Sequence, residues 1–218
     1  TALSYAVGEW ARIWPLQTLI RSLGAYFVRR ESGDPLYRRV LERYVAMATA
    51  AGVVQAVYPE GGLSRNGRLR PPRLGLLNYM LKALETDGAK DVVFVPVGIN
   101  YDRVFEDRTL VRSLEENAER RSTGFALKKT FGFIGHNLAL MVRGKWYRFG
   151  YACVNFGPPI SAKAWMDTLA AHDDDSRREH IEALGQHLMD KVGEVVPVLP
   201  VSLVATVFTR HAEGAISE

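Results

Sequence analysis

The chain has 218 residues, the size of one full domain, and its composition of 47% apolar and 24% charged residues excludes a disordered or fibrous protein. Its single cysteine, Cys153, excludes a disulfide framework and a multi-cysteine zinc site. The net charge of +4 is uneven, because residues 1–75 hold eleven arginines, no lysine and five acidic residues, whereas residues 76–218 carry a net charge of −2. Guanidinium binds phosphate or carboxylate through paired hydrogen bonds, so the first third favours an anion site. The alternative explanation for the excess of arginine over lysine is codon bias toward arginine.

The apolar pattern alternates short strands with helices. We expect strands at 25–28, 53–58, 92–97 and 146–156, and helices at about 35–51, 74–84, 181–195 and after Pro200. Asp34 is placed to cap the first of these helices, with Pro35 at its first turn and Gly52 at its end.

The segment from Pro59 to Arg73 is predicted to be a loop, and residues 102–130 are predicted to be a loop or helical excursion on the surface.

Strands separated by helices predict an α/β fold with a mainly parallel sheet flanked by helices. In that sheet, 53–58 and 92–97 are expected to be adjacent, buried, parallel strands. We expect residues 1–218 to form a single domain.

Membrane-spanning helices are not expected. The longest uncharged stretches, from Arg43 to Glu60 and from Glu194 to Arg210, fall short of the roughly 20 apolar residues that a span needs. Surface attachment stays open, because Trp10 and Trp14 are residue types typical of a lipid interface; packing into a core is the alternative.

The ends of three predicted strands carry the residues suited to chemistry. The strand at 25–28 is followed by Arg29 and Arg30, the strand at 53–58 by Pro59 to Arg65, and the third contains Pro96. Ligands bind beyond the carboxyl ends of parallel strands, where a glycine pair lets backbone amides approach an anion closely. Arginines then recur four times, without an acid, over residues 65–73. These features together predict an anion-binding site.

Three sequence blocks carry a family resemblance. The runs Gly24–Arg30, Tyr58–Arg65 and Val95–Val97 resemble, in order and spacing, the second, third and fourth blocks of the glycerolipid acyltransferases. The continuation Asn66–Gly75, with Tyr101-Asp102 further on, is closest to the bacterial glycerol-3-phosphate acyltransferases and their dihydroxyacetone-phosphate relatives. The resemblance covers roughly residues 14–160.

The resemblance implies an acyltransferase that needs no metal or other cofactor. In this family a histidine of a His-x-x-x-x-Asp block takes the proton of a glycerol hydroxyl, and the oxygen attacks the thioester of acyl-CoA or acyl-carrier protein. Arginines hold the phosphate of the acceptor. The implied product is lysophosphatidic acid, made for phospholipid synthesis at the cytoplasmic face of the membrane by a peripheral protein.

The resemblance assigns the acceptor site residue by residue. The implied substrate-binding residues are Arg30, Glu60, Gly61, Gly62, Ser64, Arg65 and Arg68. Arg30 and Arg65 are expected to share one phosphate, while Glu60 and the glycine pair shape the pocket and Pro96 ends a strand at its edge. The alternative for Glu60 is an ion pair with one of these two arginines.

Two departures from the family stand out. None of the five histidines has an aspartate five positions later, namely His136, His172, His180, His187 and His211. We therefore expect that the chain, which opens at Thr1, is truncated at its N-terminus and is inactive alone. Leu63 stands where the family often has an arginine, which removes one expected phosphate ligand unless Arg68 reaches the same anion. A cluster of His172 and the aspartates at 173–175 is read as an acidic helix start rather than a metal site.

Two classes of function remain open. One is acyl transfer to glycerol-3-phosphate, dihydroxyacetone phosphate or another phosphorylated acceptor. The other is a non-catalytic module that binds anions or a lipid surface on the same fold. Nucleic-acid binding is not expected, because the arginines lack interleaved aromatic residues and lie in one loop rather than along a face.

Overall fold

The computed structural model describes part of the chain: residues 3–9, 12, 14–29, 32–62, 67–85, 88–102, 135, 139–144, 150–169 and 177–210. The chain packs as two compact units, and each is considered by itself. The first comprises Thr1–Ser64, Leu69–Gly98 and Phe156–Val195, and the second comprises Arg65–Arg68, Ile99–Asn155 and Val196–Glu218. A single domain over 1–218 stays a prediction.

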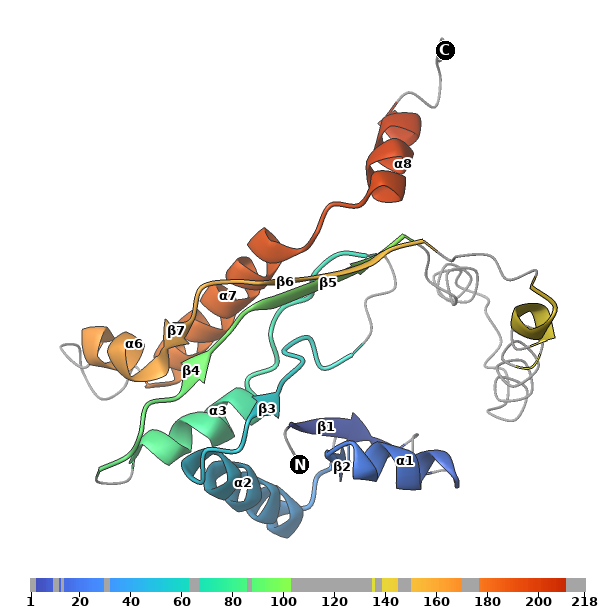
Figure 1. Cartoon of the computed structure of the whole chain (residues 1–218). Coiled ribbons are helices and arrows are strands. Elements are labelled where there is room, and N and C mark those ends of the chain that lie inside the picture. Colours follow the sequence, from blue (N-terminus) through green and yellow to red (C-terminus); the bar gives the residue numbers. More distant parts are fainter. Residues whose placement is uncertain are drawn as a thin grey trace. The chain divides into compact units, whose positions relative to one another are not determined.

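A three-stranded parallel sheet lies in the first unit, with the strand order β2-β1-β3 (Figure 1). Its strands and the helices between them are β1 (Ser4–Gly8), α1 (Leu16–Ser22), β2 (Ala25–Val28), α2 (Pro35–Ala50) and β3 (Gln55–Ala56). Tyr5 of β1 pairs with Ala25 of β2, and Ser4 pairs with Gln55 of β3. Parallel neighbours need a crossover connection, and α1 and α2 supply the two crossovers. The α/β fold class is confirmed.

Helix α2 begins and ends as the sequence predicts. The Asp34 carboxylate accepts hydrogen bonds from the backbone amides of Leu36 at 2.9 Å and Tyr37 at 3.4 Å, and Pro35 occupies the first turn. These contacts satisfy two amides that have no partner inside the helix. Gly52 follows the helix with φ of 74°, a conformation that glycine adopts without strain.

The apolar core of the first unit lies between helices and a short sheet. These elements are α3 (Gly75–Leu81), the 3-10 helix η2 (Lys82–Glu85), β4 (Val93–Phe94), β7 (Ile160–Ser161), α6 (Ala162–Leu169) and α7 (Arg177–Val195). The buried core residues are Leu77, Leu81, Ala162, Ile181, Leu184 and Leu188. The last three recur at helical spacing along one face of α7, so the predicted amphipathic helix is confirmed. Lys82 reaches Glu42 of α2 at 2.9 Å and ties α2 to η2.

The remaining strands and helix are β5 (Val97–Tyr101), β6 (Ala152–Phe156) and α8 (Pro200–Arg210), and β5 pairs with β6. Asp102, just after β5, exchanges two hydrogen bonds with Tyr151 at 2.9 and 2.8 Å, which fixes the ends of the two strands together. Helix α8 follows Pro200 as predicted, and all of its residues are exposed. Residues 146–149 of the predicted strand lie outside the described residues, as do residues 103–130.

The predicted pairing of the strands at 53–58 and 92–97 is wrong. Only Gln55–Ala56 of the first run is strand, it pairs with β1, and Val54 and Tyr58 beside it are 62% and 65% exposed. The second run is split into β4 and β5, and β4 pairs antiparallel with β7 in a separate sheet. Pro96 stands at the split, because proline has no amide hydrogen to donate to a sheet. The sequence prediction also lacked β1, which takes the central place beside β3.

No single helix of the described residues is long and apolar enough to cross a membrane. Helices α7 and α8, taken as a pair across their short break, meet the requirement on length and composition alone.

Candidate acceptor site

Three strands of the parallel sheet end at the same edge. Glu9 follows β1, Arg29 follows β2, and the turn from Tyr58 to Gly62 follows β3. Since the strands are parallel neighbours, these residues gather where ligands of open α/β sheets bind. The edge therefore combines a carboxylate, a guanidinium and a glycine pair.

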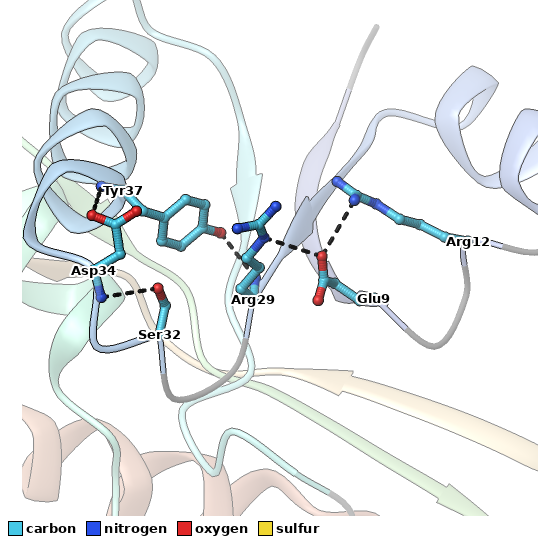
Figure 2. Close-up of polar contacts among 6 residues, drawn as sticks. All are labelled: Glu9, Arg12, Arg29, Ser32, Asp34 and Tyr37. Carbon is cyan, nitrogen blue, oxygen red and sulfur yellow. Dashed lines mark hydrogen bonds and ion pairs between the residues drawn. The ribbon is translucent and has the colours of Figure 1, made fainter.

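Glu9 organises the arginines at the end of the central strand. Its Oε1 accepts hydrogen bonds from Arg12 Nη1 at 3.2 Å and Arg29 Nε at 3.3 Å, as Figure 2 shows. The Arg29 guanidinium also lies over the Tyr37 ring, 5.6 Å from its centre, and the Arg29 amide donates to the Tyr37 hydroxyl at 2.8 Å. Arg29 is thus held by one carboxylate and one aromatic ring.

Sequence reasoning missed Glu9, because it follows a strand that the apolar pattern did not predict. One signal could have found it: Glu9 is the only acidic residue among the first 30. A single carboxylate in an arginine-rich segment is expected to pair with the arginines that the fold brings near it.

The loop after β3 folds back on itself. Arg73 donates its backbone amide to the carbonyl of Pro59 at 2.8 Å, and Arg70 donates its backbone amide to Glu60 Oε2 at 3.3 Å. The Gly61 amide donates to the Tyr58 carbonyl at 3.0 Å and closes the turn. Glu60 therefore joins the two limbs of the loop, 58–62 and 70–73, through a backbone amide of the second limb.

Glycine is required where the second limb covers the first. Gly61 has φ of 63°, and a Cβ on it would lie 2.5 Å from Arg73 Cδ. A Cβ on Gly62 would lie 3.3 Å from Arg70 Nη1, so the guanidinium of Arg70 rests directly over this residue. The glycine pair thus permits the close approach of Arg70 and Arg73, whereas its close approach to an anion stays a prediction.

Arg70 also lines an open pocket of about 490 Å³ in the same unit. The pocket lies between the second limb of the loop and α7, and its lining residues are Leu69, Arg70, Pro71, Gln186, Met189, Asp190, Gly193 and Glu194. Gly193 lets the loop approach α7, because a Cβ there would lie 3.1 Å from Leu69 Cδ1. The Glu194 carboxylate accepts from Lys191 Nζ at 2.8 Å and so is already paired.

The predicted site residues fall into three groups. Glu60, Gly61 and Gly62 lie together in the turn after β3, whereas Arg68 is exposed and belongs to the second unit. Arg30, Ser64 and Arg65 lie outside the described residues, so the sharing of one phosphate by Arg30 and Arg65 stays a prediction. Leu63, His136, His172 and His211 lie outside them too. Within the described ranges, no group of three or more His, Cys, Asp or Glu side chains could hold a metal ion.

Comparison with known proteins decides the family. The acyltransferase family matches residues 3–100, and the C-terminal region of glycerol-3-phosphate acyltransferases matches residues 138–218. The chain belongs to the acyltransferase family. The resemblance of the three sequence blocks to glycerol-3-phosphate acyltransferases is thereby confirmed.

Individual relatives agree with this family assignment. The chain is 31% identical over 211 residues to a glycerol-3-phosphate acyltransferase of Pseudomonas putida, and 30% identical over 215 residues to one of Pseudomonas fluorescens. A third, from Pseudomonas syringae, is 30% identical over 214 residues. Each alignment covers 92% of this chain and 24% of the relative, so the chain spans about a quarter of the length of these relatives.

Proposed function

We propose that this acyltransferase-family chain is the acceptor-binding part of a glycerol-3-phosphate acyltransferase. The observation that carries the proposal is the glycine turn after β3, covered by Arg70 and Arg73, at the carboxyl edge of a parallel sheet. Relatives named glycerol-3-phosphate acyltransferase over 92% of the chain support it. Dihydroxyacetone phosphate presents the same phosphate and is the alternative acceptor.

The proposed reaction transfers an acyl group from a thioester, acyl-CoA or acyl-carrier protein, to a glycerol hydroxyl. A general base removes the hydroxyl proton, the oxygen forms an ester bond with the thioester carbonyl carbon, and the carbon–sulfur bond breaks. The departing thiolate takes up a proton and leaves as a thiol. The residues of this chain would hold the acceptor phosphate and so place the hydroxyl for attack.

A His-x-x-x-x-Asp base does not occur among the 218 residues. We therefore expect the chain alone to bind acceptor without turnover, since a general base contributes roughly a hundred- to ten-thousandfold. Robust transfer from acyl-CoA to glycerol-3-phosphate by the purified chain would contradict this expectation.

The test of the acceptor site uses the predicted phosphate ligands. Arg30→Ala and Arg65→Ala should each weaken glycerol-3-phosphate binding roughly ten- to a hundredfold, the usual scale for a hydrogen bond to a charged group. Binding of acyl-CoA should change far less. Arg210→Ala, at the exposed end of α8, is the matched control. Equal loss of donor and acceptor binding would contradict the assignment of these arginines to the acceptor.

One observation favours a second candidate, a module that binds a lipid surface without catalysis. Helix α8 carries no charge before Arg210, and its apolar residues Val201, Leu203, Val204, Val207 and Phe208 are all exposed. Exposed apolar helix faces are typical of peripheral proteins at lipid interfaces. The same feature supports a peripheral location at a membrane for the enzyme, and its cytoplasmic face stays a prediction. Vesicle sedimentation with Phe208→Ser tests it, and unchanged binding would contradict the role of α8.

A further inference from the structure

The guanidinium of Arg70 lies against the glycine turn after β3. Its Nη1 is 3.3 Å from the point at which residue 62 would carry a Cβ. The hydrogen bond from the Arg70 amide to Glu60 holds the Arg70 backbone at the turn, and this keeps the side chain beside the glycine pair. The next residue after Gly62 is Leu63, which has no hydrogen-bonding group.

The charge of Arg70 is available to a ligand. The side chains of Arg70 and Arg73 are exposed, and no carboxylate of the described residues forms an ion pair with either guanidinium. Glu60 accepts a backbone amide here. The two carboxylates that line the pocket beside Arg70 are already engaged, because Glu194 pairs with Lys191 and Asp190 accepts a hydrogen bond from Gln186. Two cations at one turn repel each other unless an anion lies between them.

This arrangement contrasts with that of Arg29. Arg29 is engaged by Glu9 and lies over the Tyr37 ring, so its charge is already compensated within the fold. Arg70 shows neither kind of contact among the described residues. The two arginines therefore differ in role: Arg29 positions the chain at the sheet edge, and Arg70 presents its fork to solvent beside the glycine pair.

We propose that Arg70 is a phosphate ligand of the acceptor site, supplying the guanidinium that Leu63 does not. This inference rests on the proposed function. The Arg70 side chain is exposed beside Gly62, so its planar fork can donate two hydrogen bonds to a phosphate on its solvent side. Arg73, whose side chain packs across Gly61, adds a second positive charge to the same turn.

The inference is tested by calorimetric titration of the 218-residue chain, once with glycerol-3-phosphate and once with inorganic phosphate. Arg70→Ala should weaken binding of both ligands about tenfold or more, because it removes hydrogen bonds to a charged group and keeps the backbone amide that Glu60 accepts. Arg178→Ala is the matched control, since Arg178 is 89% exposed and pairs only locally, with Glu182 one turn away in α7. Its binding should equal that of the parent.

A second variant makes the test specific. Adding Leu63→Arg to Arg70→Ala should restore most of the lost affinity, because a guanidinium returns to the residue beside Gly62. Parent-like binding by Arg70→Ala would overturn the inference and leave the proposed function standing. If Arg70→Ala weakens both ligands but the parent binds glycerol-3-phosphate no better than inorganic phosphate, Arg70 remains an anion ligand and the proposed acceptor is wrong.

Discussion

The contact between Glu60 and the Arg70 amide predicts a measurable local effect. Glu60→Ala removes the acceptor of this hydrogen bond, whereas Glu60→Gln keeps an acceptor oxygen at the same position. The 3.3 Å length and the partial exposure of Glu60 place the contribution of this hydrogen bond below the usual range for a charged acceptor, at about 1 kcal/mol. That energy corresponds to an about fivefold increase in the fraction of molecules in which the Arg70 amide is not hydrogen-bonded and is open to exchange.

Amide hydrogen exchange reads this bond directly. In Glu60→Ala the Arg70 amide should exchange about fivefold faster than in the parent, and in Glu60→Gln it should exchange at nearly the parent rate. The Asn78 amide, bonded to the Leu74 carbonyl at 2.8 Å, is the internal reference and should not change. Equal exchange of Arg70 in the parent and in Glu60→Ala, or equal acceleration in both variants, would refute the role of Glu60.

Three further predictions concern stability. Although burial opposes the charge of Asp91, hydrogen bonds from Ser161 and from backbone amides hold its pKa below the ordinary 3.8. Asp91→Asn should therefore lower the free energy of unfolding at pH 7, and denaturant titrations should show the difference shrinking below about pH 4. Burial, with the charges of neighbouring tyrosines, raises the pKa of Tyr26 to about 12. Stability should therefore fall as the pH rises from about 10 to 12, and less in Tyr26→Phe. Leu184→Ala should cost about 2–5 kcal/mol in denaturant titrations, since Leu184 is fully buried, whereas the exposed Leu203→Ala should cost under about 0.5 kcal/mol.

Local signals in the sequence predicted the helices well. The cap at Asp34 and the apolar spacing along α7 depend on residues within one or two turns, so each segment determines its own helix. Strand pairing depends on residues far apart in the chain. The run Val53–Tyr58 looks buried by composition, yet the central strand β1 leaves it only a two-residue pairing at the sheet edge.

The site was predictable only where it depends on residues close together in the sequence. The turn Glu60–Gly62 was found from its motif and its place after a strand. The position of Arg70 over Gly62 follows from a loop that folds back over about ten residues, which no periodicity encodes. Glu9 was missed because its importance depends on Arg29, 20 residues further along the chain.

The central claim is that the glycine turn after β3, together with Arg70 and Arg73, recognises the phosphate of a small acceptor. Calorimetric titration of the chain with glycerol-3-phosphate and with glycerol, at low and high salt, tests it most directly. We predict binding of glycerol-3-phosphate that weakens as salt rises, and no measurable binding of glycerol. Equal binding of the two ligands, or no binding of glycerol-3-phosphate at low salt, would contradict the claim.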